Sequence, residues 1–310
     1  MEAIPLRETV EAPKPMVMGT NLHAMLESID GLPVMPAVAA RVLAFEDDVV
    51  SVVELSEVLS ADPALTAALL KVANSAYYGF ARELSTVREA VMLLGFKQVR
   101  QVAVGASVMH AWRCIGRERD GFDLDLFWGH SMAVAMMAET AARKFHAARP
   151  EEAFTAGVVH DMGVLALRKV YPAEFALAFE QAQERGAPLC DAELEFLGVT
   201  HAQVGAALAE RWRLPSRLVE AVGRHHDALL TPGGDGLAGV LGFADQVTEH
   251  YGVHCGYARG HIVQLSKLPD ELATLEIACG GISSVLERSC AFISSVSGAP
   301  KVWYPATRAA

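Results

Sequence analysis

Signals that start and stop α-helices recur along this chain, whereas signals for β-strands are almost absent. Ser51–Glu54 and Thr86–Glu89 each match the capping box, in which a hydroxyl residue precedes a Glu by three positions. Asp62 followed by Pro63 gives an N-cap and a first-turn proline, and Gly95 is placed to end a helix. No segment alternates apolar and polar residues over the length of a strand. The sequence therefore predicts an all-α fold.

The helices are expected to form two lobes. Residues 21–116 form the N-terminal helical lobe, polar residues 117–124 form a linker, and residues 125–295 form a second helical bundle. Residues 1–20 and 296–310 are expected to be tails, the first of them flexible. Helices of the second lobe are expected at about residues 125–146, 151–170, 172–185, 189–212, 216–226, 237–251 and 272–295.

Composition and charge narrow the class of function. The chain has 310 residues, of which 52% are hydrophobic and 20% charged, as in an ordinary globular protein. Its formal net charge of −11 repels a phosphate backbone, so we expect no nucleic-acid partner. The helix after Asp62 carries only Lys71 as a cation that could reach a base, which is too few for a DNA-recognition helix.

Cellular location follows from two further features. No uncharged run reaches the roughly 18 residues that a membrane-spanning helix needs, so no membrane association is expected. The five cysteines never occur as a C-x-x-C pair, and we interpret them as scattered thiols of a protein in the reducing cytoplasm. They are Cys114, Cys190, Cys255, Cys279 and Cys290.

Residues able to bind a metal occur in a definite order within the second lobe. They are His130, His160, Asp161, His201, His225, His226 and Asp245. Helical spacing predicts that they point inward, because His201 shares a helix face with Val204 and Leu208, and Asp245 lies one turn after Leu241. A buried Asp needs a partner, and helical bundles build metal sites from inward side chains on facing helices.

Mixed imidazole and carboxylate donors suit iron, manganese or zinc, and the two oxygens of one Asp can bridge a pair of ions. Such a pair activates water and holds phosphoryl oxygens. The residues leave open whether one divalent ion, two or none is bound, because a lone inward His is commonly a hydrogen-bonded core residue. A dry site, in which the histidines bond to one another, is the structural alternative.

Local motifs in this chain resemble those of the HDOD family, the HD-related output domains of bacteria. The motifs are Leu32–Pro36, Asp62–Leu65, Ala73–Gly79 and Leu94-Gly95, then Phe154–Gly163, Leu197–Gly205, Trp212–Pro215 and His225-His226. The resemblance covers about residues 22–251 in the right order. It implies two helical lobes, the second related to HD phosphohydrolases, and a non-catalytic role in bacterial signal transduction.

The second lobe also resembles the HD-GYP phosphodiesterases, which hydrolyse cyclic di-GMP with bound metals. The seven ordered residues match the ligand pattern there, but two motifs differ. Val164 stands where those enzymes have a Lys, and Asp227–Gly234 replaces their Gly-Tyr-Pro motif. Loss of a cation that acts in the transition state costs on the order of 10²–10³ in rate. Arg168 or Lys169, one turn later, is expected to replace that Lys only in part.

We therefore interpret the chain as a signal-transduction output module that binds a partner protein or a phosphorylated nucleotide between its lobes. Cations near the His cluster would contact an anionic ligand, and they are Arg211, Arg213, Arg217 and Arg224. The alternative is a divergent metal-dependent phosphohydrolase that acts on a nucleotide or a cyclic dinucleotide. An oligomer is compatible with either interpretation.

Overall fold

The computed structural model describes residues 31–45, 51–75, 78, 80, 82–112, 121–227, 231–255 and 268–297. Every regular element in these ranges is an α-helix, which confirms the all-α prediction. None of the described helices combines the length and the apolar character needed to cross a membrane. The expected N-terminal tail, residues 117–120 of the expected linker, and residues 298–310 of the expected C-terminal tail lie outside the described ranges.

The first lobe contains five described helices, three of which start at the predicted caps Ser51, Asp62 and Thr86. They are α2 (Ala37–Leu43), α3 (Val52–Ser60), α4 (Pro63–Ala73), α5 (Val87–Leu94) and α6 (Phe96–Trp112). The Asp62 carboxylate accepts hydrogen bonds from the backbone amides of Ala64 and Leu65. Thr86 and Glu89 form the complete capping box. Helix α2 begins at Ala37, because Pro36 is the extended residue before the first turn.

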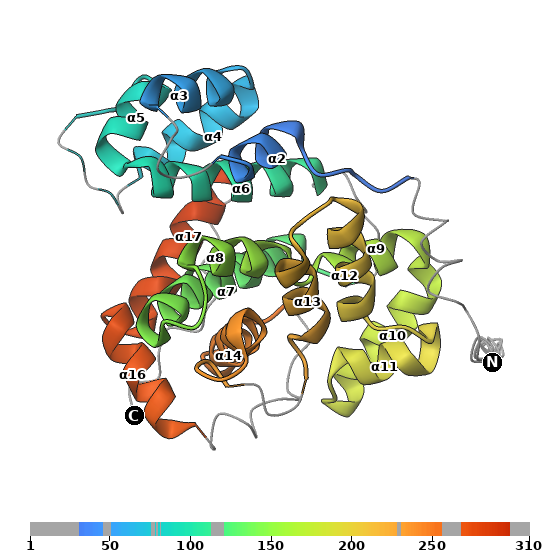
Figure 1. Cartoon of the computed structure of the whole chain (residues 1–310). Coiled ribbons are helices and arrows are strands. Elements are labelled where there is room, and N and C mark those ends of the chain that lie inside the picture. Colours follow the sequence, from blue (N-terminus) through green and yellow to red (C-terminus); the bar gives the residue numbers. More distant parts are fainter. Residues whose placement is uncertain are drawn as a thin grey trace, which may run out of the picture.

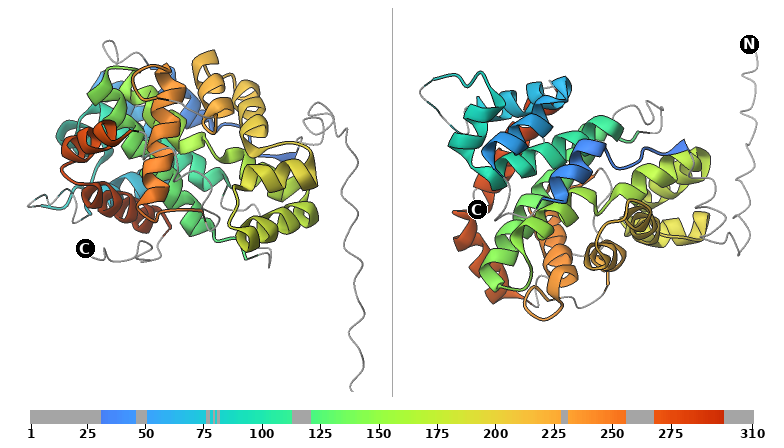
Figure 2. Two further views of the ribbon diagram at one scale, coloured as in Figure 1. Left: turned by 90° about the horizontal axis from the view of Figure 1, so that it is seen from below. Right: turned by 45° about the horizontal axis from the view of Figure 1, so that its top comes forward.

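The second lobe is a larger bundle. Its helices are α7 (Leu124–Phe145), α8 (Pro150–Val159), α9 (Met162–Val170), α10 (Pro172–Arg185), α11 (Leu189–Leu197), α12 (His201–Arg211), α13 (Ser216–Arg224), α14 (Gly236–His250), α16 (Pro269–Cys279) and α17 (Ile282–Ser297). Seen from below, α14 crosses the lobe between α16 and α17 on one side and α10–α13 on the other (Figure 2). Helix α17 extends two residues into the expected C-terminal tail.

Three helices that we predicted as continuous are each broken in two, so those predictions are wrong. The helix expected at 189–212 breaks at Gly198, and that at 272–295 breaks at Gly280, both of which are left-handed C-caps. The helix expected at 151–170 breaks at His160 and Asp161. Asp161 stands at the N-cap position of α9, but its carboxylate makes no capping bond, so it is available for other contacts.

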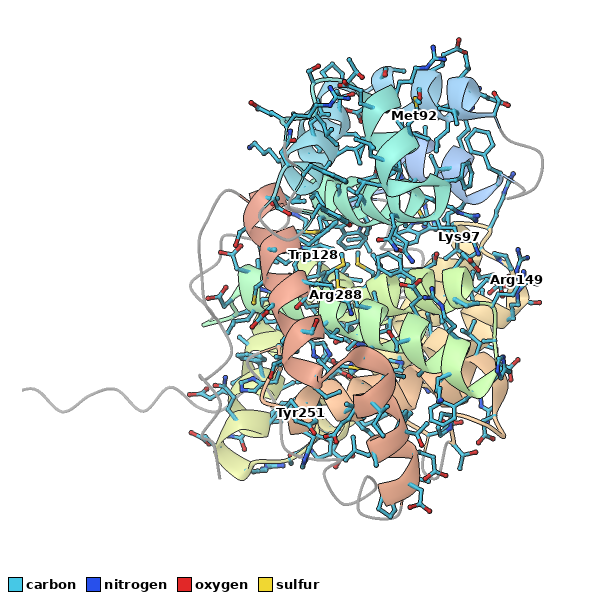
Figure 3. The ribbon with its side chains drawn as sticks, turned by 90° about the vertical axis from the view of Figure 1, so that its left-hand side faces the viewer. Met92, Lys97, Trp128, Arg149, Tyr251 and Arg288 are labelled. Carbon is cyan, nitrogen blue, oxygen red and sulfur yellow. The ribbon has the colours of Figure 1, made fainter. Side chains whose placement is uncertain are left out.

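The two lobes share one hydrophobic core. It joins Leu55 and Leu69 of the first lobe to Trp128 of α7 and Phe292 of α17. Helix α17 packs against both α7 and α4, and it rises from the second lobe toward the first (Figures 1 and 3). An ion pair of 2.5 Å between Lys97 of α6 and Glu151 of α8 adds a contact across the same junction (Figure 3). The described helices therefore pack as one body.

Glycines allow the helices around the His residues to approach closely. A Cβ atom at Gly163 on α9 would lie 2.7 Å from the carbonyl carbon of His201 and 2.8 Å from the amide nitrogen of Gly205. Both atoms belong to the backbone of α12, so they cannot move aside as a side chain would. Contact between the backbones of α9 and α12 thus sets the separation of Asp161 from His201.

Gly163→Ala is expected to destabilise the protein by about 1–3 kcal/mol, because the added methyl group has to push α9 and α12 apart. The free energy of unfolding in urea would measure the loss. Gly233→Ala is the matched control, since a Cβ atom there has nothing within 4 Å. The control is expected to change stability by no more than about 0.5 kcal/mol. Equal stability of the two variants would contradict close backbone packing at Gly163.

Candidate metal centre

The seven ordered His and Asp residues meet at one place in the second lobe. His130 comes from α7, and His160 and Asp161 come from the break between α8 and α9. His201 begins α12, His225 and His226 follow α13, and Asp245 lies on α14. Six of the seven residues are at most 2% exposed, and the His226 side chain is 18% exposed. The sequence prediction that they converge and point inward is confirmed.

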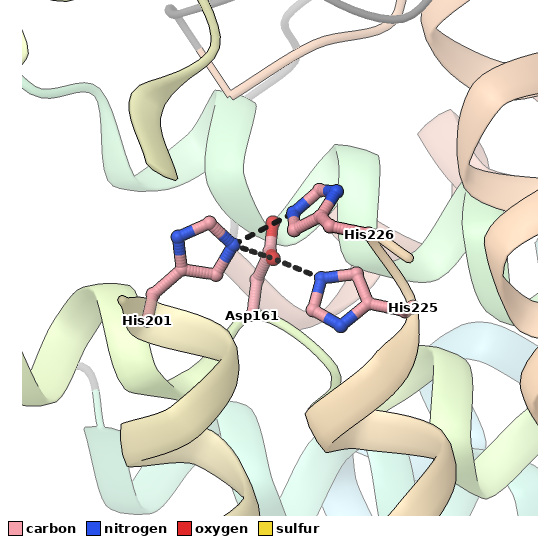
Figure 4. Close-up of side chains that lie close together, drawn as sticks. All are labelled: Asp161, His201, His225 and His226. Atoms are coloured by element: carbon pink, nitrogen blue, oxygen red, sulfur yellow. Dashed lines mark hydrogen bonds and ion pairs between the residues drawn. The ribbon is translucent and has the colours of Figure 1, made fainter. Parts of the chain in front are cut away.

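The carboxylate of Asp161 lies between two pairs of histidines. Its Oδ2 atom is 3.3 Å from Nε2 of His160 and 3.8 Å from Nε2 of His130. Its Oδ1 atom is 3.4 Å from Nε2 of His201 and 3.5 Å from Nε2 of His225. Figure 4 shows the second pair together with His226 around this carboxylate. Each oxygen of Asp161 therefore faces its own set of imidazole nitrogens.

Asp245 and His226 complete the two sets. The Oδ1 atom of Asp245 lies 3.0 Å from Nε2 of His130 and 3.8 Å from Nε2 of His160. The Nε2 atoms of His201 and His226 are 2.8 Å apart (Figure 4). In each set, one donor atom per residue lies within 4.8 Å of the donor atoms of the other residues. The first set is His130, His160 and Asp245. The second set is Asp161, His201, His225 and His226.

Backbone carbonyl groups orient three of these histidines. The Nδ1 atoms of His130, His160 and His225 lie 2.9, 2.8 and 2.6 Å from the carbonyl oxygens of Val253, Gly157 and Val222. A carbonyl oxygen only accepts, so each Nδ1 carries the proton and each Nε2 faces the centre. The buried Nε2 atoms of His160 and His225 make no hydrogen bond. Nitrogen atoms held in this way are the donors that a metal ion needs, so the residues fit an ion.

Sequence analysis missed Glu193, which fixes a fourth histidine. The Glu193 carboxylate is fully buried and accepts hydrogen bonds of 2.7 Å from both the Nδ1 and the backbone amide of His201. In the continuous helix that we predicted, eight residues would place Glu193 about 12 Å along the axis from His201. The break at Gly198 folds α11 back toward α12 and brings the two residues together. A Gly in an otherwise helical pattern was the signal available for this turn.

Cys255 is the second residue of the centre that sequence analysis missed. Its thiol is buried and donates to Oδ2 of Asp161 over 3.5 Å. We had interpreted the cysteines as scattered thiols, because no spacing between them matches a metal motif. Cys255 reaches the centre from the turn that follows α14, ten residues after Asp245.

Of the cations predicted to contact a ligand, Arg168 and Arg224 have other partners in the structure. Arg168 is buried, with its guanidinium 4.9 Å from the centre of the Phe122 ring. Lys169 is exposed. Arg224 pairs on the surface with Glu220 and Asp227 over 2.9 and 2.8 Å. Val164, at the position of the Lys in HD-GYP enzymes, is fully buried in the apolar core.

Arg217 lines a pocket of about 390 Å³ at the junction of the lobes. The pocket is surrounded by four elements: the end of α2, α6, the start of α8 and the start of α13. Its lining includes Phe45, Arg100 and Arg149. The Arg217 guanidinium makes a 2.5 Å ion pair with Glu152, which also lies 3.5 Å from Arg149. This pocket therefore combines several charged groups with elements of both lobes.

Burial and charge act in opposite directions on the titrating groups of the centre. Burial raises the pKa of Asp161, but His160, His225 and His201 outweigh it and hold that pKa well below the ordinary value. Burial lowers the pKa of His130, yet its hydrogen bond to Asp245 and the nearby carboxylates raise it to about 9. Burial and neighbouring imidazoles lower the pKa of His226. These shifts keep Asp161 and Asp245 charged and favour a positive charge on His130 but not on His226.

The fold and the site together define an all-α bundle in which buried His and Asp residues from separate helices converge. The family model described as "HDOD domain" matches residues 32–228. The chain belongs to the HDOD domain family. This result confirms the resemblance drawn from the sequence motifs.

A relative from Treponema pallidum, strain Nichols, named only as an uncharacterized protein, is 25% identical over 210 residues. The match covers 67% of this chain but 40% of the relative, so the chain spans about two fifths of that protein's length. It supplies no function for this chain.

Solved structures share the fold over most of this chain. An HDOD domain protein of unknown function from Geobacter sulfurreducens has a TM-score of 0.74 and 24% identity, with 89% of this chain and 96% of that chain covered. A candidate phosphohydrolase from Shewanella amazonensis SB2B has a TM-score of 0.63 and 29% identity, with 91% and 100% covered. A candidate signal transduction protein from Marinobacter aquaeolei VT8 has a TM-score of 0.67 and 23% identity, with 89% and 64% covered.

In metal-free protein, His130 is expected to make stability depend on pH. Its pKa is raised from 6.5 to about 9 on folding, so the stability that it adds is complete below pH 6.5 and is lost as the pH rises through about 9. Unfolding in urea between these pH values would measure the loss. His130→Gln is expected to flatten the profile, whereas the control His110→Gln, at an exposed position on α6, should retain it.

Burial and the charge of Asp245 raise the pKa of Glu249 from 4.5 to about 8. Glu249 therefore adds a separate loss of stability as the pH rises from about 4.5 to about 8. The difference between wild type and His130→Gln isolates the contribution of His130. Parallel profiles for these two proteins would contradict the prediction.

Proposed function

We propose that this chain is a signal-transduction module that holds two divalent ions and binds a phosphorylated ligand or a partner protein without turning it over. The placement of Asp161 between two sets of imidazole nitrogens is the observation that carries the proposal. His130, His160, Asp161 and Asp245 would hold one ion, and Asp161, His201, His225 and His226 the other. Iron, manganese or zinc suits this mixture of donors.

Bound ions at this centre would supply positive charge for phosphoryl oxygens and acidity for a coordinated water. The residues of the chain itself supply orientation. Carbonyl groups and Glu193 hold four imidazoles in one tautomer, and the backbone contact at Gly163 keeps Asp161 beside His201. Ligands held in place before the ion arrives lose little conformational freedom on binding, which favours tight retention.

Two observations argue against turnover. Six of the seven donor residues are at most 2% exposed, whereas a catalytic metal site keeps a position open for the reacting group. Val164 also places an apolar side chain in the core where the related phosphodiesterases carry a Lys. Arg168, which lies one turn later, has its guanidinium against Phe122. Retention of ions and loss of hydrolysis are therefore compatible within one centre.

We place the phosphorylated ligand or the partner's contact in the pocket between the lobes. Arg100, Arg149 and Arg217 reach this pocket from three different elements, beside Glu151 and Glu152. An anion there would replace Glu152 as the partner of Arg149 and Arg217. Because elements of both lobes line the pocket, an occupant would strengthen the contact between them. Changes in that contact are a direct way to transmit a binding event to a partner protein.

The second candidate function is a divergent metal-dependent phosphohydrolase. The observation in its favour is the complete set of seven donors, with the Nε2 atoms of His160 and His225 directed inward and making no hydrogen bonds. A second observation also favours this function. The chain is 29% identical to the candidate phosphohydrolase from Shewanella amazonensis, and the match covers all of that protein. Hydrolysis that disappears in His225→Ala would support it over the binding module.

Metal content tests the proposal most directly. Protein purified without chelators is expected to contain about two equivalents of transition metal, as a bridged pair requires. Asp161→Asn and His225→Ala are expected to lose most of it, because each removes a donor from the centre, and His110→Gln should retain it. Elemental analysis measures the content, and cyclic dinucleotides then serve as substrates in a hydrolysis screen.

The outcomes of this experiment separate the alternatives. Less than about a tenth of an equivalent in wild type would contradict both the metal-holding module and the phosphohydrolase, and would favour a dry structural site. Two equivalents with no hydrolysis would support the module. Two equivalents with hydrolysis that His225→Ala abolishes would overturn the non-catalytic proposal.

Glu193→Gln is expected to weaken metal binding by about 10–100-fold, the usual effect of losing a carboxylate that orients a ligating His. The physical reason is that the neutral amide accepts a weaker hydrogen bond from Nδ1 of His201, so it holds less firmly the tautomer that directs Nε2 inward. Competition titration with a chelating dye would measure the affinity. Glu195→Gln, two residues along α11 and paired with Arg185 on the surface, is the matched control. Equal affinities of the two variants would contradict the role of Glu193.

A further inference from the structure

We propose that Cys255 is a further ligand of the metal position formed by His130, His160, Asp161 and Asp245, here called the first position. The second position, formed by Asp161, His201, His225 and His226, would then differ from it in chemistry. This inference rests on the proposed function and extends it, because the seven residues expected from the sequence contain only nitrogen and oxygen donors. Cys255 is 1% exposed, and its sulfur lies 3.5 Å from Oδ2 of Asp161. Donor atoms of His130, Asp161 and Cys255 all lie within 4.8 Å of one another.

The chain brings Cys255 to the centre by a short, well-bonded turn. Helix α14 ends at His250, and Gly252, with a φ of +83°, lets the chain reverse. The amide of Val253 then donates to the carbonyl of Thr248 over 3.1 Å. The carbonyl of Val253 accepts from Nδ1 of His130, two residues before the Cys255 thiol contacts Asp161. One segment thus orients a His ligand and places a thiol beside it.

The thiol lies on one side of Asp161 only. Oδ2 of Asp161 faces Nε2 of His160 at 3.3 Å, Nε2 of His130 at 3.8 Å and the sulfur of Cys255 at 3.5 Å. Oδ1 faces His201 and His225. The other nearby thiol, Cys190, groups with Glu193 and His201 and lies 3.8 Å from Nδ1 and 4.0 Å from Nε2 of that imidazole. Cys255 therefore adds a sulfur to one group of possible ligands, with His130 and Asp161, and His130 also belongs to the neighbouring group with His160 and Asp245.

Sulfur changes which ion the first position prefers. A thiolate is a soft ligand that favours zinc or iron(II) over manganese or magnesium, whereas the second position offers three imidazoles and a carboxylate. To bind an ion, the Cys255 thiol gives up its proton to solvent, and the sulfur then bonds to the ion in place of its hydrogen bond to Asp161. We expect a zinc or iron(II) ion at the first position.

Cobalt(II) binding to the full-length protein tests the assignment. Visible d–d absorption reports cobalt held by imidazole and carboxylate, and near-ultraviolet charge-transfer absorption reports a cobalt–thiolate bond. Wild type is expected to show both. Cys255→Ser should keep the visible bands and lose the charge-transfer band, whereas the control Cys190→Ser should keep both. Zinc affinity of Cys255→Ser is expected to fall by at least about tenfold, with manganese affinity nearly unchanged.

Each outcome bears on one claim. Wild-type protein with visible bands but no charge-transfer band overturns the role of Cys255 and leaves the proposed metal centre intact, whatever the variants do. A charge-transfer band that survives in Cys255→Ser and disappears in Cys190→Ser also overturns it. Wild type that binds no cobalt contradicts the proposed metal centre itself. If Cys255→Ser fails to fold, Cys255→Ala repeats the comparison without a hydroxyl group.

Discussion

A carboxylate removed from water needs several kcal/mol of compensation, and Asp161, which is 2% exposed, obtains it from imidazoles on separate segments of the chain. Those segments have to lie within about 4 Å of both carboxylate oxygens at once. The glycine contact between α9 and α12 and the helix break at Asp161 itself meet this requirement. The architecture of the second lobe can therefore be understood as the arrangement that satisfies one buried negative charge.

Much of the fold follows from local chemistry that the sequence displays. The capping box at Thr86, the cap at Asp62 and the bounds of α10 agree with the predictions, because these features depend on neighbouring residues. The inward direction of the seven His and Asp residues was also predictable from helical spacing. The positions of Glu193 and Cys255 were not, because they depend on turns at Gly198 and Gly252 that reverse the chain in three dimensions. Residues brought to a site by such reversals carry no periodic signal.

The proposed function separates binding from catalysis, and the geometry of the centre is compatible with that separation. Donor atoms persist where the fold itself depends on them, since the histidines also compensate the buried Asp161 and Asp245. Val164 sits in the apolar core, where it stabilises packing and has no electrostatic role. Compared with the HD-GYP pattern, Val164 lacks a cation at this position but contributes to the packing of the core. The pocket between the lobes then offers a binding surface that does not depend on turnover.

Helix α17 has a consequence for the way the protein is made. It packs against α4, yet 208 residues separate the end of α4 at Ala73 from the start of α17 at Ile282. At about 5–20 residues per second, a ribosome needs roughly 10–40 s to synthesise that interval. During this time the apolar surface of the first lobe that α17 later covers stays open to water and to other nascent chains. The last helix that the structure describes thus ends a period of vulnerability that began with the first lobe.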